Sequence, residues 1–164
     1  MKRHLRALAI VIIAPIFLGI LACNTLAPQP PPDLRHLQLQ FLGGFIYANL
    51  MPMIPPDPID ARVILLARNT SSQSMTGLRV LKADVYLKSN DQRLGSIEFF
   101  SDWSGTISPN RQDTVVAQKV SEATKLFDPA CGSSVYLTIF VGTDSSNSKR
   151  VVADNLTFSC VYEQ

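Results

Sequence analysis

Histidine is the residue type that most limits the chemistry this chain could perform. The sequence contains two, His4 and His36, and only His36 lies outside the apolar N-terminal segment. A Ser-His-Asp or Cys-His arrangement would have to be built around it. His36 follows a Pro-rich stretch, whereas catalytic groups must be held to within about 0.5 Å. We therefore expect no enzyme and assign no catalytic residue.

Two pairs of carboxylates are close enough in the sequence for acid–base work. Asp57 and Asp60 flank Pro58 in a predicted loop, where acidic residues usually serve turns. Glu98 and Asp102 stand at the predicted end of a strand, where charges usually face solvent. Neither pair therefore indicates a catalytic site.

No motif in the sequence points to a metal or a cofactor. Asp144 and Asn147 share a polar loop, but one acid and one amide are far short of the six oxygen ligands that calcium takes. A G-x-G-x-x-G, a P-loop, H-E-x-x-H and G-x-S-x-G are all missing. We expect neither cofactor nor metal.

Trp103 beside Phe99 and Phe100 is the most suggestive cluster for binding. An aromatic ring exposed on a loop can stack on a sugar or anchor a partner. The alternative is that Trp103 caps one end of the hydrophobic core. The three residues are candidate binding residues on this basis.

Cys131 and Cys160 are predicted to form a disulfide, which persists in an oxidising compartment. In an antiparallel hairpin, placing one cysteine opposite the other sets the register of the whole pair. That register pairs apolar residues with apolar ones, Val135 with Leu156 and Ile139 with Val152. The alternative is two free buried thiols.

The N-terminus has the layout of an exported protein. Residues 2–6 are basic, residues 7–22 carry no charge, and a small residue, Ala22, precedes Cys23. The run Ile20-Leu21-Ala22-Cys23 resembles the lipobox of bacterial lipoproteins. The resemblance implies a signal peptide over residues 1–22 and a fatty-acylated Cys23 that palmitate analogues would label.

The same resemblance implies a lipid-anchored protein of the bacterial envelope whose partner is the membrane. Asn24 follows the cysteine, which implies the outer membrane if the host has two. Two alternatives stay open: an uncleaved membrane helix, or secretion after cleavage behind Ala22 or Ala27.

The rest of the chain divides into a tether and one domain. Residues 23–36 include Pro-Gln-Pro-Pro-Pro, which favours extended polyproline II at ~3.1 Å per residue and indicates a spacer. Residues 37–164 show period-2 patterning separated by turn residues, with no long helical stretch. The expected strands cover 37–50 with a bend at Gly43-Gly44, and 61–69, 78–89, 93–100, 106–110, 112–120, 134–142 and 151–162.

Seven or eight such strands predict an all-β fold, an antiparallel β-sandwich of the immunoglobulin-like kind. Residues 51–58 are expected to form a loop, and residues 121–133 to have local helical or irregular character. Asn69-Thr70-Ser71 and Asn155-Leu156-Thr157 match the N-glycosylation sequon. Beside a lipobox we interpret both as coincidence.

The net charge argues against nucleic acid as a partner. Lys2, Arg3 and Arg6 lie in the expected signal, so its removal leaves 12 basic and 13 acidic residues, a net charge of −1. Such a neutral chain offers no overall attraction to DNA, RNA or an anionic membrane surface. We expect a non-enzymatic binding or structural module. The alternatives are an accessory subunit of an envelope complex and an envelope hydrolase with an unrecognised loop site.

Overall fold

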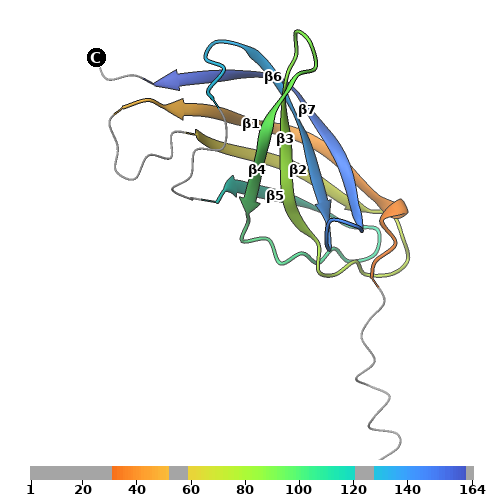
Figure 1. The fold of residues 1–164 in the computed structure, drawn as a ribbon. Helices are drawn as coiled ribbons and strands as arrows, with labels where there is room; N and C mark the ends of the chain where they lie inside the picture. Colours follow the sequence, from red (N-terminus) through yellow and green to blue (C-terminus); the bar gives the residue numbers. More distant parts are fainter. Residues whose placement is uncertain (1–30, 52–58, 121–127, 162–164) are drawn as a thin grey trace, which may run out of the picture. The chain divides into compact units, whose positions relative to one another are not determined.

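The computed structural model describes residues 31–51, 59–120 and 128–161, and it is all-β over them (Figure 1). Within these ranges, one short 3₁₀ helix precedes seven strands. The elements are η2 (Leu34–His36), β1 (Leu37–Asn49), β2 (Ile59–Asn69), β3 (Arg79–Leu87), β4 (Arg93–Phe100), β5 (Gln112–Lys119), β6 (Ser134–Gly142) and β7 (Ser148–Val161). The all-β prediction is confirmed. Seven of the expected strands are present, and the eighth, at 106–110, is reduced to a single bridge between Met75 and Ile107.

The strands form one sheet that closes on itself in the order β1-β2-β5-β4-β3-β6-β7. All neighbours are antiparallel except β1 and β7, which pair in parallel over Ile46–Asn49 and Phe158–Val161. The join between β4 and β5 is also short, with two residue pairs. The sheet is thus a closed barrel, which departs from the two-sheet immunoglobulin-like sandwich expected from the sequence.

Alternation along the strands places the core inside the barrel. In β2 the residues from Ile59 to Asn69 alternate between buried and partly exposed, and β6 repeats the pattern. Every strand contributes to the largest fully buried side chains, and Ile107 adds one from the segment between β4 and β5. They are Phe158, Leu37, Ile46, Ile59, Leu65, Ile97, Ile107, Leu137, Ile139, Val63, Val85 and Val115. This alternation therefore places one face of each of these strands in the core.

The Gly43-Gly44 pair produces the predicted bend in β1. The register against β2 shifts between Phe41 and Gly43, so the strand carries a bulge there. A β-carbon on Gly44 would lie 2.3 Å from the carbonyl oxygen of Arg62. Only glycine lets the two backbones come this close.

The terminal hairpin of β6 and β7 follows the predicted register at one end only. Val135 lies opposite Leu156, as the cysteine pairing predicts. Ile139 lies opposite Val151 and not Val152, so this second pairing is wrong by one residue. The cause is a register shift between Val135 and Leu137, which the index sum of a regular hairpin cannot show.

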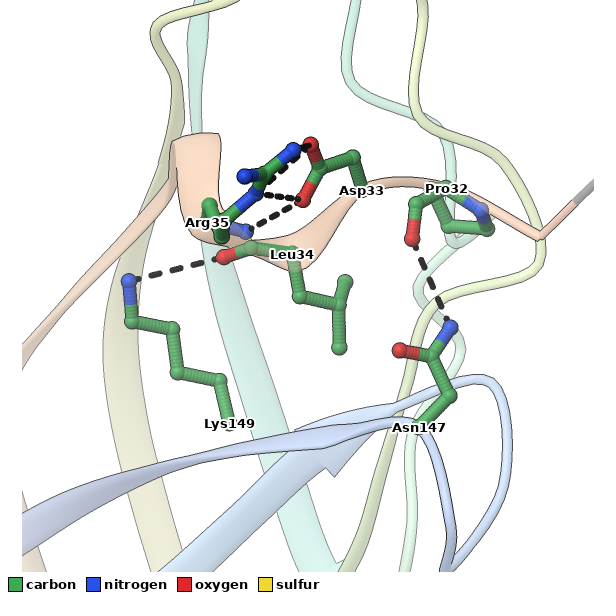
Figure 2. Close-up of polar contacts among 6 residues, drawn as sticks. All are labelled: Pro32, Asp33, Leu34, Arg35, Asn147 and Lys149. Carbon is green, nitrogen blue, oxygen red and sulfur yellow. Dashed lines mark hydrogen bonds and ion pairs between the residues drawn. The ribbon is translucent and has the colours of Figure 1, made fainter.

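The segment before β1 belongs to the barrel, although the sequence placed it in the tether (Figure 2). The side chain of Leu34 is buried in the core. Lys149 Nζ donates to the carbonyl oxygens of Leu34, at 3.5 Å, and of Leu37. Asn147 Nδ2 donates to the carbonyl oxygen of Pro32 at 3.4 Å. The compact unit accordingly begins at residue 31 and not at 37.

Candidate binding groove on the barrel wall

A groove of about 420 Å³ lies on the outer face of the barrel. Its floor comes from neighbouring strands: Arg62 of β2 lies opposite Gln118 of β5. Thr114 and Val116 alternate with buried residues of β5 and therefore point outward. Ser101 and Asp102 line the groove together with Phe100 and Trp103. The volume falls in the range of small-ligand sites.

The alternation of β4 decides which aromatic residues reach the groove. Phe99 faces the interior and is 7% exposed, so it belongs to the core. Phe100, the next residue, faces outward and is 62% exposed. Trp103 packs partly against the core, and its Nε1 donates to Asp113 Oδ2 at 2.9 Å. Of the three candidate residues, the structure brings Phe100 and Trp103 together.

Arg62, which lines the groove, has a side chain whose hydrogen bonding is incomplete. Its Nε is buried and has no hydrogen-bond partner among the residues that the structure describes. An unsatisfied buried donor costs about 1–3 kcal/mol. No local feature of the sequence indicates this buried donor, because the pairing of β2 with β5 creates its surroundings.

The other residues considered for chemistry lie away from the groove or have structural partners. His36 is exposed in η2, where its carbonyl oxygen accepts from Thr70 Oγ1 at 3.0 Å. Asp60 Oδ1 accepts from the backbone of Ala61 at 2.7 Å. Glu98 is exposed on β4, and Asp57 lies outside the described residues. Asp102 alone lines the groove.

Asp144 organises the turn between β6 and β7. Its Oδ1 accepts from the hydroxyl and the backbone nitrogen of Ser146, at 2.6 and 2.8 Å, and from the backbone nitrogen of Asn147 at 2.9 Å. The Ser146 hydroxyl is the largest of the causes that lower the pKa of Asp144 to about 2. The described ranges contain no group of three or more His, Cys, Asp or Glu side chains that could hold a metal ion.

The Cys131–Cys160 disulfide is present in the structure. The two Cα atoms are 5.4 Å apart, and the bridge joins the turn before β6 to the end of β7. Cys160 lies opposite Ala48 in the parallel pairing that closes the barrel. The bridge therefore holds the last strand where the sheet closes.

Asn69, the asparagine of the first sequon, is buried, and its side chain joins two loops by hydrogen bonds. It has no exposed surface, and its Nδ2 donates to the carbonyl oxygens of Gln73, Ile107 and Ser108 at 2.7, 3.1 and 3.3 Å. Its Oδ1 accepts from the Ser71 backbone nitrogen at 2.9 Å. Asn69 is therefore inaccessible for glycosylation in the folded chain, and sequence reasoning missed its structural role.

Asp84 is a second buried polar residue that the sequence did not single out. Arg93 Nη2 donates to its Oδ1 at 3.0 Å, and the hydroxyl of Ser96 donates to the same oxygen. Burial raises the pKa of Asp84, but the hydrogen bonds from Ser96 and Arg93 together with Lys82 outweigh it and lower the pKa below its ordinary value. Asp84 is thus a charged partner that joins β3 to β4.

Cys23 and the whole expected signal peptide lie before the first described residue. Across residues 31–51, 59–120 and 128–161 the structure contains no helix long and apolar enough to cross a membrane. A scan against models of protein families found no match for the chain, and a search of curated proteins found no matching relative.

Proposed function

We propose that this chain is a lipid-anchored, non-enzymatic binding module of the bacterial cell envelope. Cys23 carries the lipid, and a short Pro-rich tether joins it to the barrel. The ligand is a sugar of the envelope, bound in the groove beside Phe100 and Trp103. The observation that carries the proposal is this groove, with an exposed aromatic ring at its edge.

The groove chemistry supports a sugar ligand. A sugar ring has an apolar C–H face and a rim of hydroxyls that donate and accept hydrogen bonds. Phe100 and Trp103 offer aromatic surface, while Arg62, Thr114 and Gln118 offer polar groups. Oxygen atoms on the ligand would accept hydrogen bonds from the charged guanidinium of Arg62, which lines the groove.

The lipid anchor and the envelope location rest on the sequence. The run Ile20-Leu21-Ala22-Cys23 supports acylation, and Asn24 supports the outer membrane of a host with two membranes. The non-enzymatic part of the proposal rests on the shortage of histidine. His36 lies in η2 and does not line the groove.

A second candidate role, accessory subunit of an envelope complex, is favoured by one observation. The pairing of β1 with β7 covers four residues, and within the described chain the first half of β1 pairs with β2 alone. Leu42 and Val152 are exposed on these two strands. An extended segment of a partner could add to such an edge.

Fluorescence of Trp103 tests the sugar-binding role, because the sequence has one tryptophan. Titration with soluble peptidoglycan fragments should shift its emission saturably. Phe100→Ala should weaken binding roughly tenfold, since an aromatic contact contributes about 0.5–1.5 kcal/mol beyond its area. Val152→Ala, which shortens an exposed apolar residue on another strand, is the matched control and should change nothing.

The outcome that contradicts the proposal is an unchanged emission, or equal weakening by Phe100→Ala and Val152→Ala. A photo-crosslinking residue placed at Phe100 or at Val152 in the living host separates the two roles. Adducts on cell-wall glycan from position 100 support the binding module. Adducts on one envelope protein from position 152 support the accessory subunit.

A further inference from the structure

Arginines gather at the end of the barrel where the described chain begins. This end is formed by η2, by the turns that join β2 to β3 and β6 to β7, and by the segment before β5. Figure 1 shows η2 in orange beside the blue turn between β6 and β7. The arginines at this end, which we call the tether end, are Arg35, Arg68, Arg79, Arg111 and Arg150.

Four of these arginines have no acidic partner among the residues that the structure describes. Arg35 pairs with Asp33 at 2.7 Å, but the other salt bridges among the described residues involve Lys82, Lys88 and Arg93 and none of the remaining four arginines. The four without an ion pair in this set are exposed: Arg68, Arg79, Arg111 and Arg150. Their positive charge is therefore available to an anionic partner.

The charges of the barrel are unevenly distributed as a result. With Lys149, the tether end has six basic residues against four acidic ones, Asp33, Asp102, Asp113 and Asp144. The remainder of the described chain has five basic and six acidic residues. The charges of these two regions nearly cancel in the net charge of the chain. Composition alone therefore does not reveal the basic end.

We propose that the tether end docks on anionic lipid headgroups of the membrane that holds the anchor. This inference rests on the proposed function, because acylated Cys23 would keep the barrel at that surface. Pro31 is eight positions after Cys23, a reach of at most about 28 Å for an extended chain. The tether joins the barrel at its basic end, so that end is the one nearest the lipid.

Each arginine should contribute appreciably once it reaches the surface. A basic residue close to an anionic leaflet strengthens binding by a factor of about five. The attraction decays over a Debye length of about 8 Å at physiological salt. Tethering raises the local concentration of the barrel, so that even weak contacts orient it.

The test uses the mature chain with Cys23→Ser, so that binding does not depend on acylation. Co-sedimentation with vesicles of 30% phosphatidylglycerol in phosphatidylcholine should exceed that with pure phosphatidylcholine by at least tenfold, and added salt should abolish the excess. The triple variant R68Q/R111Q/R150Q should lose about 100-fold of the partitioning, at about fivefold per charge.

The triple variant K88Q/R93Q/K119Q removes the same charge away from the tether end and should change partitioning less than threefold. Equal loss in both variants, or no preference for phosphatidylglycerol, would overturn the docking proposal. Melting curves of both variants check that the barrel stays folded. Failure of the anchor itself would appear in the mass of the native N-terminus and not in this assay.

Discussion

Asn69→Asp is the substitution whose effect the structure defines most sharply. The new oxygen would replace a nitrogen that donates to the carbonyl oxygens of Gln73, Ile107 and Ser108. Two N–H groups are lost, each contributing about 1 kcal/mol net, and buried acceptors are left unsatisfied at about 1–3 kcal/mol. We expect a loss of about 3 kcal/mol of unfolding free energy at pH 7.

The loss should also depend on pH in a defined direction. A buried carboxylate facing carbonyl oxygens favours its protonated form, so the folded variant binds more protons than the unfolded one above pH about 4. Its stability should therefore fall, relative to the parent, as the pH rises from 4 to 7. Urea unfolding followed by circular dichroism at several pH values measures both effects.

The control is Asn155→Asp, the same chemical change in the second sequon. Asn155 is exposed and has a φ of 61°, a conformation that aspartate also tolerates. It should cost less than about 0.5 kcal/mol. Equal losses of unfolding free energy at the two positions, or a loss at Asn69 that does not vary with pH, would refute the proposal that Asn69 joins the two loops.

Three further predictions follow from the described contacts. Cys160→Ser should lower the free energy of unfolding by about 3–4 kcal/mol, because the disulfide closes a loop with a sequence separation of 29. Peptide mapping without reduction should find Cys131 and Cys160 linked, and two alkylatable thiols would disprove the bridge. Lys149→Met should lower the free energy of unfolding by about 2 kcal/mol and expose residues 31–36 to proteases, because the Lys149 ammonium donates to the carbonyl oxygens of Leu34 and Leu37. The control Lys88→Met, at an exposed ion pair, should lower it by less. Hydrogen bonds within the loop lower the pKa of Asp144 to about 2. The ionised Asp144 should therefore stabilise the folded chain fully above pH about 4, and this contribution should disappear as the pH falls through 2. If the melting temperature of the Asp144→Asn variant follows that of the parent over this range, the prediction is wrong.

Local patterning predicted the strands because alternation is visible in the sequence. The bounds of β4 match the predicted 93–100, and the Gly43-Gly44 bend is a bulge as expected. Closure of the barrel was not predictable in the same way. It depends on a parallel pairing of β1 with β7, in which partners such as Ile46 and Phe158 are 112 positions apart in the sequence.

The candidate site was predictable only in part, for a similar reason. The aromatic cluster is visible in the sequence, and the alternation of β4 sends Phe99 inward and Phe100 outward. Arg62 joins the groove because β2 pairs with β5, a contact between non-consecutive strands. Asn69 looked like a sequon, and nothing local shows that two distant loops enclose it.

The N-terminal residue of the native protein tests the central claim most directly. Intact mass and N-terminal peptide analysis of protein extracted from host membranes should give a chain that begins at Cys23 and carries diacylglycerol. Cys23→Ser should abolish labelling by a palmitate analogue. An unlabelled membrane protein that begins at Met1, or a soluble one that begins at an unmodified Cys23 or at Pro28, would contradict the lipid-anchored account.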